Sequence, residues 1–288
     1  MAERLTETAR AKVNLTLRVL GRRPDGYHEL ESLVAFADIG DLVTLDVGAP
    51  AGVTVSGPFA HAIDGENIAE RTLRRIAEVA PTLRIGAVGI EKRLPVAAGI
   101  GGGSADAAAV LRAVRRADPG RASSVDWPAL AATLGADVPV CLASTAQFMW
   151  GVGRETVRLP TLPSLPTVLV NPGVPLATVE AFGGLNAPPA PVWAEPPPMP
   201  GPFSDVKSVC AYLRASGNDL EPPARALCPE IGQVLAALAG ETGVLVVRMS
   251  GSGATCFAIF GTAADAEAAA GRLSARNPGW WVVATTLG

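Results

Sequence analysis

Residues 95–105 read PVAAGIGGGSA, and their four glycines stand directly before a helical pattern. The apolar residues that follow have the i, i+3, i+4, i+7 spacing of an amphipathic helix, at Ala107, Val110, Leu111 and Val114. Alternating apolar residues over 83–94 predict a strand before the loop. In this order of strand, glycine-rich loop and helix, unpaired backbone amides at the start of the helix face a ligand. The pattern therefore predicts an anion site, above all for phosphate.

Two better-known phosphate motifs do not fit this loop. The P-loop requires a lysine before its hydroxyl residue, but Gly103 precedes Ser104. The dinucleotide motif GxGxxG, counted from Gly99 and Gly101, would need a third glycine at position 104. A simpler alternative stays open, in which the glycines form a flexible turn and Ser104 caps the helix.

The amino-terminal segment 11–20 alternates apolar and polar residues, so it predicts a half-buried strand with Lys12 and Asn14 on the same face. The turn signal Pro-Asp-Gly at 24–26 predicts a hairpin, and Tyr27 and His28 lie just beyond that turn. By themselves these residues allow structural roles, with Lys12 on a solvated strand face and the two rings in packing contacts.

Asp137 follows a short helical pattern over 127–134, which Gly135 is expected to end in the left-handed conformation. On its local sequence alone, Asp137 could be a helix cap or a turn residue. The segment 250–253, SGSG, joins two predicted strands, 244–249 and 255–260. It could be a hairpin turn or a second backbone surface beside phosphate.

The character of the chain changes near residue 155, so we expect an amino-terminal domain over 1–155 and a carboxyl-terminal domain over 156–288. Eight prolines within 186–203 predict a loop, because neither a helix nor a central strand accepts them. The later segments predict helices and strands in the order helix, strand, strand, helix, strand. This order indicates an antiparallel sheet covered by helices, and therefore an α+β fold.

The composition excludes several classes of protein. The net charge is −3 with no block of like charge, which argues against a nucleic-acid partner. No apolar run is long enough to span a membrane, and the first residues do not resemble an export signal. The four cysteines are far apart in the sequence and there are only two histidines, so we expect neither a disulfide framework nor a structural zinc site. We expect a cytoplasmic enzyme, either a monomer or a weak homodimer.

Together these segments resemble one superfamily, the GHMP kinases. The carrying motifs are PVAAGIGGGSADAAA at 95–109 and MSGSGATCFAIF at 249–260. Three further segments resemble the branch that phosphorylates a cytidyl-methylerythritol substrate, namely 11–33, LGADVPV at 134–140 and NDLEPPA at 218–224. The resemblance implies a two-domain α+β fold, with a domain like ribosomal protein S5 followed by a ferredoxin-like domain. It also implies transfer of the ATP γ-phosphoryl group to the 2-hydroxyl of that substrate, in the non-mevalonate route to isoprenoid precursors.

The resemblance further assigns roles to individual residues. Lys12 and Asp137 match the catalytic pair, and Ser104 matches the hydroxyl nearest Mg²⁺. The ATP-phosphate cradle comprises Pro95, Val96, Ala97, Ala98, Gly99, Ile100, Gly101, Gly102, Gly103, Ser104 and Ala105. Other nucleotide contacts are expected at Asn67 and Lys92. The expected substrate contacts are Asn14, Tyr27, His28, Thr178 and Phe182.

Some positions depart from the family pattern. Ala97 and Ala98 replace glycines found in some members, which should stiffen the loop, and Met149 and Trp150 stand where a polar residue is commoner. Asp106 should stabilise the start of its helix unless a metal bridges it to phosphate. Two other functions stay open. One is a sister kinase acting on homoserine or a mevalonate-type alcohol, and the other is a nucleotide-binding regulator without catalysis.

Overall fold

The computed structural model describes residues 4–63, 65–190 and 197–288, and these residues divide into two compact units. Unit 1 contains the described residues of 4–11, 39–96 and 101–144. Unit 2 contains those of 12–38, 97–100 and 145–288. Strands β1 (Arg4–Asn14) and β3 (His28–Asp46) each begin in one unit and end in the other. The expected domain limits at residue 155 stay a prediction.

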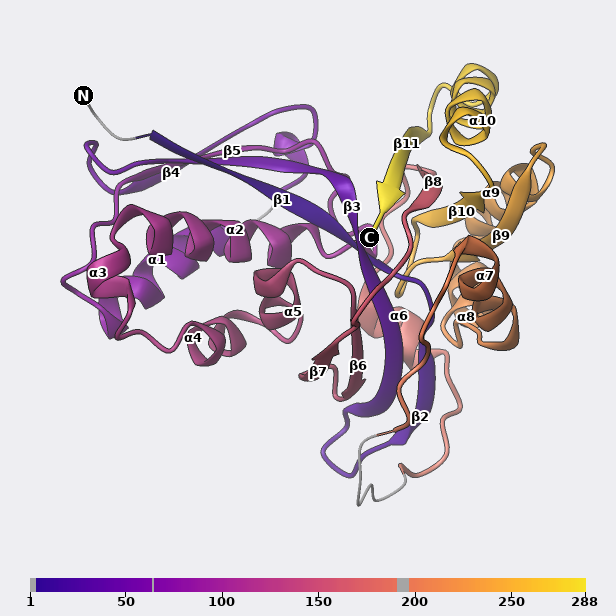
Figure 1. The fold of residues 1–288 in the computed structure, drawn as a ribbon, viewed down its shortest axis with the longest axis horizontal. Coiled ribbons are helices and arrows are strands. Elements are labelled where there is room, and N and C mark those ends of the chain that lie inside the picture. The colour runs from indigo at the N-terminus through magenta and orange to yellow at the C-terminus, as the bar shows by residue number, and fades with distance from the viewer. Residues whose placement is uncertain (1–3, 64, 191–196) are drawn as a thin grey trace. The chain divides into compact units, whose positions relative to one another are not determined.

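Unit 1 is a sheet with helices on one face (Figure 1). Strand β4 (Gly52–Ser56) runs parallel to β5 (Ala87–Glu91), which pairs antiparallel with the second half of β3, and β1 pairs with β3. The helical elements of this unit are η1 (Ala60–Ala62), α1 (Ile68–Val79), α2 (Gly102–Ala117), α3 (Pro119–Ala122), α4 (Trp127–Leu134) and α5 (Val138–Ala143).

Helix α2 is the central helix of unit 1 and packs against α1, α4 and α5. Most of its residues between 105 and 117 are buried, and many of these are alanines, so neighbouring helices can approach closely. Helix α1 begins at a capped end, where the Asn67 side chain accepts a hydrogen bond from Ala69 N at 2.8 Å. The loop between β5 and α2 is therefore held between well-formed elements.

Unit 2 contains an antiparallel sheet in the order β11-β8-β10-β9, and β11 also pairs with β3 at Leu287 and Ala37. Strands β2 (Arg18–Arg22) and β6 (Gln147–Gly151) pair with the first half of β3, and β7 (Glu155–Arg158) pairs with β6. The remaining strands are β8 (Leu165–Asn171), β9 (Val244–Met249), β10 (Cys256–Phe260) and β11 (Trp281–Leu287). The helices are α6 (Thr178–Gly183), α7 (Val206–Ala215), α8 (Glu221–Leu227), α9 (Glu230–Ala239) and α10 (Ala263–Arg276).

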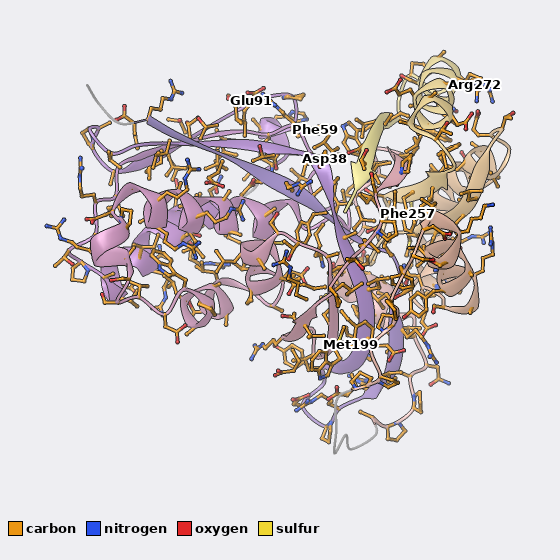
Figure 2. The ribbon with its side chains drawn as sticks, in the orientation of Figure 1. Asp38, Phe59, Glu91, Met199, Phe257 and Arg272 are labelled. Carbon is orange, nitrogen blue, oxygen red and sulfur yellow. The ribbon has the colours of Figure 1, made fainter. Side chains whose placement is uncertain are left out.

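The core of unit 2 lies between this sheet and its helices. Helix α10 packs on β8 and β11, and α9 packs on β9 and β10. Every residue of β10 is buried, including Phe257, which Figure 2 labels. The continuous burial of a central strand explains why its sequence is apolar without alternation. The expected antiparallel sheet covered by helices is confirmed.

Two local predictions were wrong. The strand expected over 11–20 ends at Asn14, and β2 starts again at Arg18, because Ser32 Oγ donates to Thr16 O and Leu33 N donates to Thr16 Oγ1 at the break. Gly135 is extended, with φ 166°, and does not take the left-handed conformation expected of it. The described parts of the proline segment lie outside helices and strands, as predicted, and residues 191–196 lie outside the described residues.

Candidate active site

The glycine-rich loop adopts alternating backbone conformations. Ala97, Gly99 and Gly101 have φ values of 52°, 73° and 65°, in the left-handed region. Residues in the left-handed region recur in backbone turns whose neighbouring N–H groups can bind an anion. Gly101 is the N-cap of α2 and supplies no side-chain cap, while Ser104 lies inside the helix. The alternative in which Ser104 caps the helix is therefore wrong.

Within unit 2, three contacts fix the first half of this loop. Lys12 N donates to Ile100 O at 2.9 Å, Thr255 N donates to Ala98 O at 3.2 Å, and Ser250 Oγ donates to Gly99 O at 3.1 Å. A Cβ at Gly99 would lie 2.5 Å from Gly253 O, so this approach requires glycine. The segment 250–253 is thus more than a hairpin turn, because it holds the glycine-rich loop.

The same segment holds two of the expected substrate residues. Asn14 N donates to Ser250 Oγ at 3.1 Å, and Asn14 Nδ2 donates to Ser32 Oγ at 2.7 Å. The hydroxyls of Thr178 and Ser252 lie 2.9 Å apart in a hydrogen bond. Asn14 is buried while Thr178 is exposed. A single hydroxyl, Ser250 Oγ, therefore connects Asn14 to the glycine-rich loop.

The expected aromatic residues also lie in unit 2. The rings of His28 and Phe182 stack with centroids 4.9 Å apart and planes 29° apart. Tyr27 is 62% exposed, so it presents a large ring to solvent. Burial, with a smaller effect of Arg22, lowers the pKa of His28. A neutral imidazole at pH 7 can both donate and accept a hydrogen bond, which suits recognition of a base edge.

The two expected catalytic residues belong to different units. Lys12 lies in unit 2 and is only 4% exposed, so the alternative in which it lines a solvated strand face is wrong. Asp137 lies in unit 1 at the N-cap position of α5. Unlike Asp126, whose carboxylate accepts from Ala129 N at 3.0 Å, Asp137 makes no side-chain capping bond to its helix among the described residues. The pairing of Lys12 with Asp137 stays a prediction.

Lys92, expected near the nucleotide, forms a buried ion cluster in unit 1. Its ammonium donates to Asp41 Oδ2 and, at 2.7 Å, to Asp106 Oδ2. Asp41 Oδ1 accepts from Arg93 N at 2.6 Å and from Leu94 N at 2.8 Å. The Lys92 ammonium lies 3.7 Å from the position of a Cβ on Gly102, beside the start of α2. This cluster, Asp41–Lys92–Asp106, therefore ties β3 and α2 to the residue that follows β5.

Asp106 does not have the role expected of it at the start of its helix. It lies beyond the first turn of α2, is 3% exposed, and leaves Oδ1 without a hydrogen-bond partner among the described residues. Burial raises the pKa of Asp106 to about 7, although attraction to Lys92 opposes the shift. Burial alone would lower the pKa of Lys92, but the two carboxylates raise it. The ion pair with Lys92 therefore explains the buried position of Asp106 better than an interaction with the helix dipole does.

The remaining nucleotide candidates are Asn67 and Ser104, both in unit 1. Asn67 uses its Oδ1 to cap α1. Ile68, the residue after Asn67, lies 3.9 Å from the position of a Cβ on Gly103, the residue before Ser104. No group of three or more His, Cys, Asp or Glu residues in the described chain is placed to hold a metal ion.

Sequence reasoning placed Asn218 in the motif at 218–224 but gave it no role, whereas the structure shows that its side chain bonds to the 250–253 segment and to its neighbours. Its Nδ2 donates to Met249 O and Gly251 O, each at 2.8 Å, and its Oδ1 accepts from Leu220 N at 3.0 Å. Next to it, Asp219 Oδ2 accepts from Val19 N at 2.8 Å. The Asn-Asp pair followed by a helix start could have indicated such local bonding, but not its distant partners.

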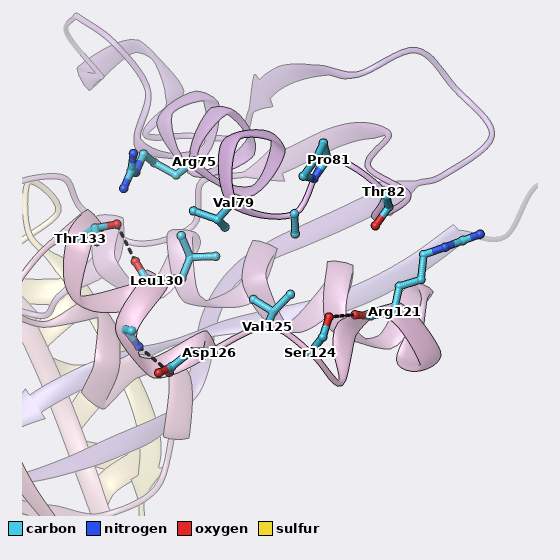
Figure 3. A pocket seen from close by; sticks show the side chains of 12 residues that line it. Arg75, Val79, Pro81, Thr82, Arg121, Ser124, Val125, Asp126, Leu130 and Thr133 are labelled. Carbon is cyan, nitrogen blue, oxygen red and sulfur yellow. Dashed lines mark hydrogen bonds between the residues drawn. The ribbon is translucent and has the colours of Figure 1, made fainter.

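A separate pocket of about 400 Å³ lies in unit 1, at the end of α1 beside α3 and α4 (Figure 3). Apolar side chains such as Val79 and Leu130 line it together with Arg75 and Arg121, whose guanidinium groups pair with Glu78 and Asp118. None of the expected site residues lines this pocket within the described ranges.

Across the described ranges, every helix is too short or too polar to cross a bilayer.

Comparison with known proteins identifies the family. Residues 67–145 match the model of the GHMP kinase N-terminal domain, and residues 203–279 match that of the GHMP kinase C-terminal region. A 4-diphosphocytidyl-2-C-methyl-D-erythritol kinase from Rhodopseudomonas palustris is 49% identical over 98% of this chain and 97% of its own length. The chain belongs to the 4-diphosphocytidyl-2-C-methyl-D-erythritol kinase family. This membership confirms both the resemblance and the GHMP fold predicted from sequence.

Solved structures agree with this family. A crystal structure of a 4-(cytidine 5′-diphospho)-2C-methyl-D-erythritol kinase is 35% identical, with a TM-score of 0.77 and 99% coverage of both chains. A homoserine kinase from Cytophaga hutchinsonii has a TM-score of 0.65 at 18% identity, covering 100% of this chain and 96% of its own. The second likeness shows the fold alone. The 4-diphosphocytidyl-2-C-methyl-D-erythritol kinase family is therefore the one that carries functional comparison.

Proposed function

We propose that this chain transfers the γ-phosphoryl group of ATP to the 2-hydroxyl of 4-diphosphocytidyl-2-C-methyl-D-erythritol, in the non-mevalonate route to isoprenoid precursors. The observation that carries the proposal is the position of Ser250. Its hydroxyl accepts from Asn14 N and donates to Gly99 O, so it links an expected acceptor contact with the expected phosphate loop. Family membership supports the same reaction.

In the proposed mechanism Asp137 accepts or orients the proton of the acceptor hydroxyl. Lys12 favours the ionised carboxylate and offsets the charge that develops as phosphate transfers. Burial of Lys12 supports this role, since a buried ammonium interacts more strongly with nearby anions than an exposed one does. Positioning and electrostatics supply most of the acceleration in such reactions.

The nucleotide phosphates would bind the backbone amides of the loop over 95–105 and of the first residues of α2. The left-handed residues Ala97, Gly99 and Gly101 turn backbone amides toward the ligand, and the helix dipole favours its negative charge. Mg²⁺ would be held by phosphate oxygens, water and the Ser104 hydroxyl, and would neutralise charge on the transferring group.

The cytidine end of the substrate would lie at Tyr27, His28 and Phe182. The exposed Tyr27 ring and the stacked pair offer aromatic faces to a base, and neutral His28 offers a directional hydrogen bond. Asn14 and Thr178 supply polar contacts at the methylerythritol end, beside the 250–252 hydroxyls.

The first experiment measures ADP release by the purified chain with ATP and Mg²⁺. Acceptors are 4-diphosphocytidyl-2-C-methyl-D-erythritol, methylerythritol 4-phosphate, homoserine and mevalonate. The proposal predicts turnover only with the cytidyl acceptor. Turnover of homoserine or mevalonate without cytidine would instead establish the sister-kinase function, and no turnover with any acceptor from pH 6 to 9 would refute catalysis.

The second experiment separates catalysis from nucleotide binding. Asp137→Asn should lower kcat by about 10²-fold or more while the Kd for ATP stays nearly constant. The matched control is Asp126→Asn, because Asp126 caps a neighbouring helix of the same unit and asparagine retains the cap. Equal loss of ATP binding and turnover in Asp137→Asn would indicate a structural role, as would equal effects of both variants.

We also propose that the enzyme works in the cytoplasm as a monomer or weak homodimer, without nucleic-acid or membrane partners. A domain boundary near residue 155 belongs to the same proposal. Limited proteolysis followed by mass spectrometry tests the two-domain organisation, since the first cut should fall within 186–203 and a first cut within 95–105 would contradict it. Sedimentation at two protein concentrations tests the association state.

A further inference from the structure

The proline segment that follows α6 is docked on strand β2. Arg22 N donates to Pro188 O at 2.7 Å, and Ala190 N donates to Arg22 O at 2.8 Å. These two bonds make a parallel β-bridge between Arg22 and Pro189. We call residues 188–190 the strap. Although its prolines keep it out of any regular strand, the strap adds its backbone to the edge of a sheet.

Gly21 makes this docking possible. A Cβ at Gly21 would lie 2.4 Å from Ala190 Cα and 2.8 Å from Pro189 O. Both distances are too short for non-bonded atoms, so no side chain fits at this position. The φ angle of Gly21 is not in the left-handed region, so its backbone conformation does not require glycine. Close approach of the strap is therefore the reason that glycine is needed here.

The strap is connected to the aromatic pair from both sides. Six residues before Pro188 along the chain is Phe182, at the end of α6, whose ring stacks on His28. On the other side, Arg22 pairs with His28 in the ladder between β2 and β3. Arg22 thus has the strap on one edge and His28 on the other. The segment between Phe182 and the strap is short and fixed at both ends, so docking restricts where the Phe182 ring can lie.

We propose that the strap and Gly21 set the affinity for the cytidyl base, because strap docking positions Phe182 against His28. The inference rests on the proposed function and adds residues that contact no substrate themselves. When the strap undocks, α6 is still held by α8, by the hydrogen bond between Thr178 and Ser252 and by buried Ala181. The Phe182 ring then keeps its packing on the core of unit 2 but loses the constraint from the chain that follows it, while the glycine-rich loop and its contacts to 250–255 are unchanged.

Two variants test the strap from its two sides. Gly21→Ala introduces the Cβ that collides with Ala190, and Ala190→Pro removes the N–H that donates to Arg22 O. The matched control is Gly52→Ala, because Gly52 also lies in a short strand but has open space where a Cβ would point. Circular dichroism and thermal unfolding establish that each variant is folded.

Both strap variants should raise the KM for the cytidyl acceptor about 5-fold or more, since stacking of one base on an aromatic ring is worth at least about that in affinity. The kcat and the KM for ATP should change less than about 2-fold, and Gly52→Ala should behave as wild type. Calorimetric titration with cytidine 5′-diphosphate should show the same weakening, while titration with ADP should not.

The outcomes separate this inference from the proposed function. A wild-type chain that does not turn over the cytidyl acceptor contradicts the proposed function, yet weaker cytidine 5′-diphosphate binding in the variants would still support the strap. An active wild type with unchanged acceptor KM in both variants overturns the strap inference alone. Equal losses for ATP and acceptor would identify a general structural role and also overturn it. Failure of both variants to fold would have the same meaning, and if only one folds, that variant decides.

Discussion

Removing the Lys92 ammonium should destabilise unit 1 severely. Lys92 is 3% exposed, and its partners Asp41 and Asp106 are 0% and 3% exposed. In Lys92→Met the side chain keeps its approximate volume, but both carboxylates remain buried without their cation. Loss of one partner from a buried ion pair costs about 3–5 kcal/mol, a large part of the roughly 5–15 kcal/mol that stabilises a protein.

The expected fall in Tm is about 6–20 °C, because each kcal/mol shifts Tm by roughly 2–4 °C for a protein of this size. Urea denaturation of wild type, Lys92→Met, Asp106→Asn and the double variant completes a mutant cycle. Asp106→Asn removes the charge whose Oδ1 already has no hydrogen-bond partner among the described residues. The double variant should therefore be more stable than Lys92→Met, with a coupling free energy of about 1 kcal/mol or more.

Two results of this mutant cycle would refute the prediction for Lys92. A loss below about 1 kcal/mol in Lys92→Met would show that the three charges do not depend on one another, since that is the range of an exposed pair. No gain on adding Asp106→Asn would show that Asp106 is not the carboxylate that needs Lys92. The control is Arg93→Met, because Arg93 makes an exposed ion pair with Glu91 and should change stability little.

Three other predictions concern separate parts of the molecule. Ala97→Gly should stabilise the protein by up to about 1 kcal/mol, as the cost of a left-handed alanine exceeds the entropy cost of glycine, and an unchanged or lower urea midpoint would contradict this. Asn218→Ala should lower the free energy of unfolding by about 1–3 kcal/mol, because it leaves Met249 O and Gly251 O without their donor. Asn218→Asp keeps only the acceptor and should not restore the urea midpoint. His28 should titrate below 6.5 by NMR, so protonation opposes folding and stability falls as the pH drops below about 6.5; a titration above 6.5 would reverse the sign.

The sequence predicted the local elements that depend on local patterns. The helix over 127–134 and the strand over 244–249 have the predicted bounds, and the helix after the glycine-rich loop begins at Gly102. Helix α8 was missed because two prolines, at 222 and 223, resemble a helix break. They lie in its first turn, where proline is tolerated since those N–H groups have no helical partner.

What the sequence could not predict depends on contacts between distant segments. Asp106 looked like a helix-stabilising carboxylate because its partners lie 14 residues away at Lys92 and farther away at Asp41. Burial of Lys12 was equally hidden, since a strand pattern does not show whether both faces are covered. Within unit 2, Asn14 and Thr178 bond to Ser250 and Ser252, and His28 stacks on Phe182. The pairing of Lys12 with Asp137 stays a prediction.

The hydroxyl of Ser250 has a consequence for how the protein is made. Its two partners precede it by 236 and 151 residues, so neither contact is possible until most of the polypeptide has left the ribosome. Contacts between such distant residues are slow to form because a long loop must close first. A nascent chain arrested before Ser250 should therefore contain the complete glycine-rich sequence and yet bind no nucleotide. The ability to bind nucleotide should arise late in synthesis, in a single step.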